Sequence, residues 1–328
     1  MRVWYDACTG KHVRYGTAIA RRLRKLGHQV IFTTREHPDT TALATLLGEK
    51  PIVVGKWGPA SLLTRVEESA DRMLRFAKMF KDNPPEVAIC HQSVELCRVA
   101  FGLGIPLIVT ADTPHATAVN RLTLPLASTV VAPEAISQTL LRRFGAQKIV
   151  QFRGVDEVAW TKNVEPLTTF KFKRPLIVVR QLETRSAYAL RSDDATIKEA
   201  RKLSSLGTVV FLARYGKFED EKLIVLNEFV DSAGLAAQAD LVVSVGGTIA
   251  REAALQGTPS IIISEFDPIE VNDYLSEKGF PLFRVPPSKV TVYAKKYLGK
   301  KFDVEAKLAS LEDPVDLIER MIVKKEFN

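Results

Sequence analysis

The chain contains few residues of the kinds that metal centres and disulfide scaffolds need. Of its 328 residues, 3 are Cys and 5 are His. The cysteines, Cys8, Cys90 and Cys97, are an odd number and lack the spacing of a metal-ligand motif. They are typical of a protein in a reducing cytoplasm.

Long apolar runs are also lacking. The longest stretches, such as residues 176–179 and 260–263, are far shorter than the roughly 20 residues that a membrane-spanning helix needs. Asp6 lies where a secretory signal would require an apolar run of about 7 to 15 residues. We therefore expect neither a signal peptide nor a transmembrane helix, and we predict a cytoplasmic protein.

Acidic residues are outnumbered: 46 Lys and Arg face 38 Asp and Glu, for a net charge of +8. This balance permits a polyanionic partner. Basic helix faces are present, but no recognition motif or aromatic platform accompanies them, which argues against nucleic acid. A diphosphate ligand is a simpler explanation of the positive charge than nucleic acid. Peripheral contact with an anionic membrane, through Arg72 and Lys78 on a helix at 61–80, is a further prediction.

The chain does contain a regular alternation of short apolar runs and longer amphipathic segments. Near the N-terminus, a strand, a loop, a helix over 12–26, Gly27 and a second strand follow one another. This is a βαβ unit, and such units build parallel sheets. In the first half, six strands are predicted, at 3–5, 29–33, 52–54, 87–90, 107–110 and 129–132.

A second series follows an irregular stretch at 154–174. Its predicted strands lie at 176–179, 209–212, 224–226, 241–244, 260–263 and 282–285. Asp313 and Pro314 open a last helix over 315–325. We predict two Rossmann-like, doubly wound α/β domains facing a central cleft, over 1–155 and 156–312, with 313–328 packing back on the first. The sequence predicts no oligomeric state.

One loop has the chemistry of a phosphate site. The strand 241–244 is followed by Val245, Gly246, Gly247 and Thr248, and a helix is predicted from 249. Glycines allow close approach of a ligand, and the helix N-terminus favours a diphosphate. Glu252, one turn later, could accept hydrogen bonds from both hydroxyls of a ribose. The alternative is an ordinary turn in which Thr248 is the N-cap and Glu252 is a surface residue.

The run of residues 244–259 resembles the nucleotide-binding segment of GT-B-fold enzymes. These include nucleotide-sugar glycosyltransferases and non-hydrolysing UDP-N-acetylglucosamine 2-epimerases. Phe229 and Val230 lie in a stretch similar to the part of those enzymes whose backbone holds the base. Thr9-Gly10-Lys11-His12-Val13 is similar to the Thr-Gly-Gly-His-Val loop of the transferase that makes lipid II.

Nearly the whole chain resembles an archaeal family of GT-B-like proteins of unknown function. The matching features run from Asp6 and His12, through Ala111-Asp112 and the stretch at 154–157, to residues 246–259. The resemblance implies a GT-B fold with an acceptor-side first domain and a nucleotide-sugar second domain. It implies a nucleoside-diphosphate sugar, a UDP-sugar first, as substrate, with no cofactor and no metal.

Four of the five histidines fall in polar loops that follow predicted strands: His12, His37, His91 and His115. For any one of them the alternative is a surface or N-cap residue. As a set they indicate a functional site. His12, His91 and His115 with Asp6 or Asp112 could hold a metal, but no two of them have the i, i+4 spacing of a helical site.

For glycosyl transfer, His12 is the first candidate as base or positioning residue, because a histidine pKa near 6.5 suits proton transfer. Asp112 and Asp6 complete the predicted catalytic set. The loop at 246–248, helped by Arg180, would stabilise the leaving diphosphate. The alternative for Arg180 is an ion pair with Glu183. The acceptor stays unidentified; a lipid-linked one is compatible with membrane contact.

Two other functions stay open. An epimerase would use carboxylates such as Asp112 and Glu134 at C2 of the sugar. Epimerases carry a His-Arg-x-Glu-Asn run after the first strand of the second domain. This chain has Arg180-Gln181-Leu182-Glu183-Thr184 there, without the histidine, which favours the transferase. The other class is a non-catalytic protein that binds a nucleotide sugar or a polyanion.

Overall fold

The chain folds into two compact units. The computed structural model describes residues 1–58, 61–162, 168–182, 195–213, 218–264 and 270–327. Unit 1 comprises Met1–Ala159 with Glu312–Asn328, and unit 2 comprises Trp160–Leu311. The predicted boundary after residue 155 therefore lies a few residues before this division, and Arg180 falls in the second unit.

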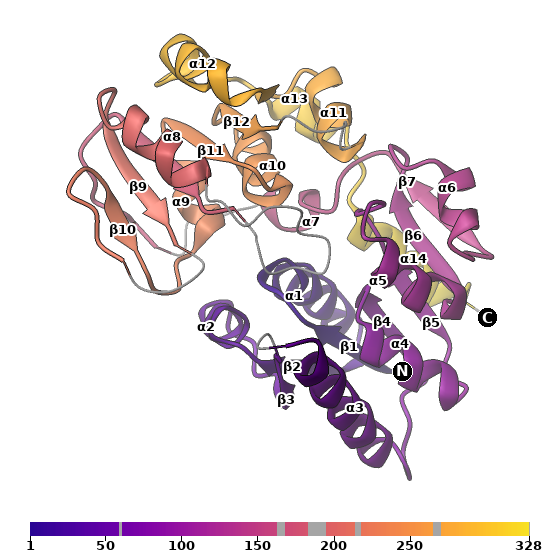
Figure 1. Ribbon diagram of the computed structural model, residues 1–328. Coiled ribbons are helices and arrows are strands. Elements are labelled where there is room, and N and C mark those ends of the chain that lie inside the picture. Colours follow the sequence, from indigo (N-terminus) through magenta and orange to yellow (C-terminus); the bar gives the residue numbers. More distant parts are fainter. Residues whose placement is uncertain (59–60, 163–167, 183–194, 214–217, 265–269, 328) are drawn as a thin grey trace. The chain divides into compact units, whose positions relative to one another are not determined.

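Unit 1 is built on a sheet of seven parallel strands, in the order β3-β2-β1-β4-β5-β6-β7 (Figure 1). Their bounds are β1 Arg2–Ala7, β2 Gln29–Glu36, β3 Ile52–Lys56, β4 Val87–His91, β5 Leu107–Thr110, β6 Thr129–Pro133 and β7 Ile149–Phe152. The six predicted strands are confirmed. The seventh, β7, lies at the edge of the sheet and is mostly half-buried, so its sequence carries a weaker apolar signal.

The helices of unit 1 follow the strands. They are α1 Gly10–Lys25, α2 Pro38–Leu46, α3 Leu62–Met79, α4 Val94–Gly102, α5 Thr117–Thr123, α6 Gln138–Arg143 and α14 Pro314–Lys324, while the short α7, Val158–Thr161, spans the division between the units. The Thr9 side chain caps α1 by accepting from the His12 N–H. Gly27, at φ 81°, ends the helix as predicted.

The C-terminal helix α14 belongs to unit 1. Asp313 caps its N-terminus by accepting from the Val315 N–H, and Pro314 occupies the first turn, as predicted. On α1, Arg22 forms ion pairs of 2.7 Å with Asp316 and 2.5 Å with Glu319. Figure 1 shows the yellow α14 among the indigo and magenta elements of this unit.

Unit 2 has six parallel strands in the order β10-β9-β8-β11-β12-β13. Their bounds are β8 Leu176–Arg180, β9 Thr208–Leu212, β10 Ile224–Leu226, β11 Leu241–Ser244, β12 Ser260–Ile263 and β13 Leu282–Val285. The helices are α8 Ala195–Leu203, α9 Ser232–Gln238, α10 Gly247–Leu255, α11 Glu270–Glu277, α12 Val290–Tyr297 and α13 Glu305–Ala309. All six strands lie where the sequence predicts them.

Both faces of the second sheet are covered. Along β8, Ile177 and Val179 belong to one buried cluster, whereas Leu176 and Val178 belong to another. Successive side chains of a strand point to opposite faces, so the two clusters are the two sides of one sheet. Two parallel-sheet α/β units confirm the predicted fold class. No helix among the described residues is long and apolar enough to span a bilayer.

Candidate functional site

In each sheet the strand order reverses between two neighbouring parallel strands. In unit 1 the reversal lies between β1 and β4, and in unit 2 between β8 and β11. In open α/β sheets, ligands bind beyond the carboxyl ends of the strands at such a point. The predicted residues that follow β1, end β8 or follow β11 lie there: His12, Arg180 and the glycines Gly246 and Gly247.

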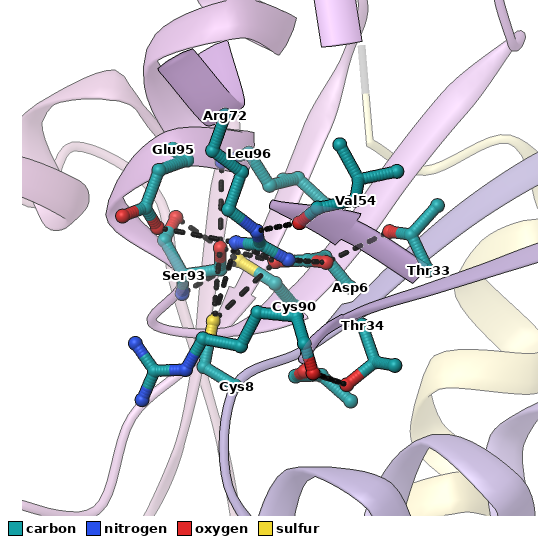
Figure 2. Close-up of polar contacts among 12 residues, drawn as sticks. Asp6, Cys8, Thr33, Thr34, Val54, Arg72, Cys90, Ser93, Glu95 and Leu96 are labelled. Atoms are coloured by element: carbon teal, nitrogen blue, oxygen red, sulfur yellow. Dashed lines mark hydrogen bonds and ion pairs between the residues drawn. The ribbon is translucent and has the colours of Figure 1, made fainter. Parts of the chain in front are cut away.

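Asp6, predicted to be catalytic, is fully buried on β1 (Figure 2). Its Oδ1 accepts hydrogen bonds from Arg72 at 2.5 Å and Thr33 at 2.8 Å. Its Oδ2 accepts from Ser93 at 2.6 Å and from Arg72 at 3.0 Å. Both oxygens are thus engaged within the core, and the structure does not place Asp6 where a substrate could reach it.

Arg72 corrects a second expectation. It is 1% exposed and extends from α3 to Asp6, Cys8 and Glu95, so it cannot contribute to membrane docking. Sequence reasoning missed this role. The signal is the spacing of Arg72, Phe76 and Phe80, which places the arginine on the same helix face as two core aromatics. Membrane contact itself stays a prediction.

The thiol beside this ion pair is not a nucleophile. Cys8 Sγ lies 3.5 Å from Asp6 Oδ2 and from Arg72 Nη1. Burial, followed by the charge of Asp6, raises the pKa of the Cys8 thiol to about 12. The group therefore stays protonated at neutral pH and acts as a packing residue.

A second buried ionic cluster surrounds Lys11, in the first turn of α1. Its Nζ bonds to Asp112, lies 2.9 Å from Asp156 Oδ2 and lies 3.7 Å from Glu157 Oε1. The side chain of Lys11 is 11% exposed, and the three carboxylates are 3%, 1% and 0% exposed. One ammonium group therefore forms ion pairs with three buried carboxylates.

His91, the last residue of β4, completes this cluster. Its Nε2 lies 3.2 Å from Asp112 Oδ1, and its Nδ1 lies 2.8 Å from Thr110 Oγ1 and 3.6 Å from Asp156 Oδ2. Burial raises the pKa of Asp156; Lys11 opposes the rise, and Asp112 adds to it. Sequence reasoning noticed Lys11 and Asp156 but did not bring them together.

Three of these residues could offer metal ligands. One atom each from His91, Asp112 and Asp156 lie within 4.8 Å of one another. A metal ion would compete with the Lys11 ammonium, which already bridges the two aspartates. Because the Lys11 ammonium already supplies a cation to these carboxylates, we propose that the protein works without a metal ion.

His12 is half-buried beside this cluster, with its ring 4.9 Å from that of His91 in an edge-on arrangement. Burial, followed by His91 and Lys11, lowers its pKa well below 6.5, so the ring is neutral at pH 7. Its Nδ1 accepts from the Cys8 backbone N–H at 3.3 Å. A neutral ring that accepts at Nδ1 carries its proton on Nε2, which makes His12 a donor and favours positioning over general-base catalysis.

The four loop histidines do not form one set. His12 and His91 lie together, whereas His37 caps α2 and packs against Trp57 at a ring distance of 5.0 Å. His115 is exposed in the loop before α5. The alternative of an N-cap or surface residue thus fits the latter two.

In unit 2, helix α10 begins at Gly247, two residues earlier than predicted. Gly246 is the N-cap, so Thr248 is not. Among the residues that the structure describes, no side chain caps this end, and no acidic residue lies in the first turn. A Cβ on Gly247 would lie 2.2 Å from Arg251 Nη1, whereas a Cβ on the exposed Gly246 would meet open space. Gly247 therefore allows the chain to pass close to the Arg251 guanidinium.

Arg251 and Asn272 support this helix end from within. Arg251 is 5% exposed and Asn272 is 2% exposed, and Nη1 of the arginine donates to Oδ1 of the asparagine at 2.8 Å. A buried guanidinium beside the positive end of a helix dipole makes the region attractive to an anion. Sequence reasoning missed both residues, although Arg251 stands inside the run that was recognised.

Glu252 differs from its predicted setting. It is 1% exposed, and its Oε1 accepts a hydrogen bond from the Trp160 indole N–H at 2.9 Å. It is therefore not the surface residue of the alternative interpretation. A direct contact with ribose requires the carboxylate to become uncovered.

The other predicted binding residues lie at the same end of unit 2. Arg180, at the end of β8, is half-buried, and its alternative partner Glu183 falls outside the described residues. Phe229 and Val230 are half-buried just before α9, and Val230 packs against a buried cluster of the sheet. Their roles toward a nucleotide stay predictions.

Two doubly wound α/β units give the chain a GT-B-like fold, and solved structures agree over nearly the whole chain. UDP-GlcNAc 2-epimerase of Methanocaldococcus jannaschii, in complex with UDP-GlcNAc and UDP, matches with a TM-score of 0.68 and 14% identity, over 99% of this chain and 100% of that one. A glycosyltransferase of Streptomyces sp. SF2575, complexed with thymidine diphosphate, matches with a TM-score of 0.57 and 19% identity, over 99% of each. At these identities the likeness establishes the fold alone.

The family follows from the sequence. The model of the family described as "Protein of unknown function (DUF354)" matches residues 1–326, so the chain belongs to that family. The chain is 30% identical over 333 residues to the uncharacterized protein MJ0665 of M. jannaschii, and 96% of each chain is covered.

Proposed function

We propose that this protein is a metal-independent glycosyltransferase that binds a nucleoside-diphosphate sugar, first of all a UDP-sugar, in unit 2. The observation that carries the proposal is the start of α10. Gly246 and Gly247 expose backbone there, no side chain in the described part of the chain caps the helix, and the Arg251 guanidinium lies beside Gly247. These groups suit a diphosphate because the helix N-terminus and the guanidinium both contribute positive charge.

The charge also suits the reaction. In transfer, the bond between the sugar C1 and the diphosphate oxygen breaks, and a bond to the acceptor oxygen forms while the acceptor hydroxyl loses its proton. Negative charge grows on the departing diphosphate. A fixed helix end with a nearby guanidinium stabilises that charge more in the transition state than in the bound donor.

In unit 1, His12 is the proposed contact to the acceptor. It lies half-buried beside the Lys11 cluster, and its neutral ring presents an Nε2–H donor. Asp112 is buried and paired both with Lys11 and with the buried His91. We assign them the role of fixing the first turn of α1, so that His12 points consistently; Asp6 is assigned a structural role.

The epimerase is the second candidate. It needs two groups that exchange a proton at C2 of the sugar. The predicted carboxylates differ in setting: Asp112 is buried against Lys11, whereas Glu134 is exposed at the end of β6. This mismatch, with the missing histidine after β8, favours the transferase.

Calorimetric titration with UDP, GDP and TDP and their sugars tests the donor site, and sub-millimolar binding of at least one is expected. Incubation of the bound UDP-sugar in deuterated water then separates the reactions, because only an epimerase exchanges the proton at C2. Sugar release or transfer without exchange supports the transferase. Binding with neither would favour a non-catalytic protein.

A further inference from the structure

The carboxylate expected to contact ribose lies under an indole ring. Glu252 is 1% exposed, and Trp160 donates to its Oε1 at 2.9 Å. Trp160 is half-buried, so of these two side chains the indole is the one that reaches solvent. The two residues are 92 positions apart in the sequence, which makes the contact a product of the fold of unit 2.

Helix geometry places this contact next to the expected diphosphate. Thr248 and Glu252 are four residues apart on α10, so they share one helix face, with the helix start at Gly247 one turn away. A diphosphate at that start would bring its ribose toward Glu252. The indole N–H uses one of the directions from which the carboxylate can accept a hydrogen bond.

We propose that Trp160 occupies the ribose position of the donor site, and that a ribonucleotide displaces its indole from Glu252. This inference rests on the proposed function, because it takes Glu252 as the ribose contact. Two vicinal hydroxyls replace one indole N–H at the carboxylate, and the indole N–H passes to water. No covalent bond changes.

The displacement makes Trp160 a determinant of specificity. A ribose offers two donors in exchange for one, whereas a 2′-deoxyribose offers one. The deoxynucleotide therefore competes less well, because its binding breaks the bond between Trp160 and Glu252 without a net gain of hydrogen bonds at the carboxylate. The site selects ribonucleoside diphosphates over their 2′-deoxy counterparts.

The test uses Trp160→Phe, which keeps an aromatic ring and removes the N–H. UDP and 2′-deoxy-UDP are the probes, since they share a base. We expect UDP to bind the variant about 10- to 100-fold more tightly than the wild type, because one hydrogen bond to a charged group no longer has to be broken. In the wild type, UDP should bind more tightly than 2′-deoxy-UDP.

Tryptophan emission gives an independent readout. On addition of UDP, the wild type should show a red shift as the indole leaves Glu252 for water. Trp57→Phe, a control in unit 1, should keep the shift, and Trp160→Phe should lose it although it binds UDP. If Trp160→Phe fails to fold, the presence or absence of the red shift in the wild type and in Trp57→Phe tests the displacement of the indole.

Equal or weaker binding of UDP to a folded Trp160→Phe would overturn the displacement, as would the absence of a red shift in wild type saturated with UDP. Either result leaves the donor site itself intact. Failure of both proteins to bind UDP, GDP or TDP would instead contradict the proposed function, and the role of Trp160 with it.

Discussion

The two units share a strand order, but the side chains at the point where that order reverses differ between them. Where the strand order of unit 1 reverses, the chain places its own ions: Asp6 with Arg72, and Lys11 with three buried carboxylates. At the reversal in unit 2 lies the N-terminus of α10, next to the Arg251 guanidinium and without a side-chain cap from the described residues. Unit 1 therefore sets its buried acidic and basic side chains against one another, whereas in unit 2 a guanidinium lies beside the N-terminus of a helix.

This difference separates stability from binding. Removing one ion of a buried pair leaves the other without its counter-charge, which costs folding free energy. Changing the start of α10 should instead affect mainly the affinity for a diphosphate. Substitutions in the two units therefore test whether stability depends on unit 1 and nucleotide affinity on unit 2.

The largest effect is expected from Lys11→Met, which leaves Asp112, Asp156 and Glu157 without their ammonium. The free energy of unfolding of unit 1 should fall by about 3–5 kcal/mol. Native-state hydrogen exchange of unit 1 amides measures it. Lys25→Met, at the exposed end of the same helix, should stay within about 0.5 kcal/mol. A loss as small as that of the control would mean that the cluster contributes little to the free energy of unfolding.

A double-mutant cycle on Asp6 and Arg72 should show strong coupling. Each single change, Asp6→Asn or Arg72→Met, should cost about 3 kcal/mol by the same exchange experiment. The double variant should cost clearly less than the sum, because neither partner is then left buried alone. Additive losses would show that the two residues act independently.

In unit 2, Glu252→Gln should leave the fold in place and weaken nucleotide binding by about 1–3 kcal/mol, because charged hydrogen bonds to ribose are replaced by neutral ones. Calorimetry with UDP measures the change. Glu277→Gln, at the exposed end of α11, is the control and should bind UDP like the wild type. Unchanged affinity in Glu252→Gln would mean that Glu252 does not contact the ribose and only accepts the hydrogen bond from Trp160.

The adjacent glycines offer a matched comparison. A Cβ at position 247 would lie 2.2 Å from Arg251 Nη1, so Gly247→Ala should push the guanidinium away and cost about 1–2 kcal/mol in affinity for UDP. Gly246→Ala adds a Cβ to open space at a φ of −83° and should change affinity little. Equal effects of the two substitutions would argue against a built site at this helix end.

The smallest effect concerns pH. The pKa of His12 lies well below 6.5 in the folded protein, so its contribution to stability is present above pH 6.5 and is lost as the pH falls below that value. The slope from this one group cannot exceed about 1.4 kcal/mol per pH unit. Between pH 7 and 5.5, the wild type should lose more stability than His12→Gln in urea unfolding. His115→Gln, at an exposed site, should follow the wild type.

Local patterns were sufficient for most of the fold. Apolar runs and their spacing located twelve of the thirteen strands among the described residues, all but the half-buried edge strand β7. Gly27, Asp313 and Pro314 marked helix ends correctly. These features depend on neighbouring residues, which a sequence displays directly.

The site was less predictable because its contacts join distant segments. Arg72 meets Asp6 across 66 positions, and Trp160 meets Glu252 across 92. The residue types alone suggested a catalytic aspartate and a surface glutamate or ribose ligand. Only the packing of α3 on the first sheet, and of Trp160 on α10, reveals that both carboxylates are buried and hydrogen-bonded.

The most direct test of the contrast between the units is calorimetry of the wild-type protein with UDP, GDP and TDP. We expect at least one to bind below millimolar concentration, with affinity lowered by Gly247→Ala but not by Gly246→Ala. Absence of binding for all three would contradict a nucleotide site at α10, and with it the proposed glycosyl transfer.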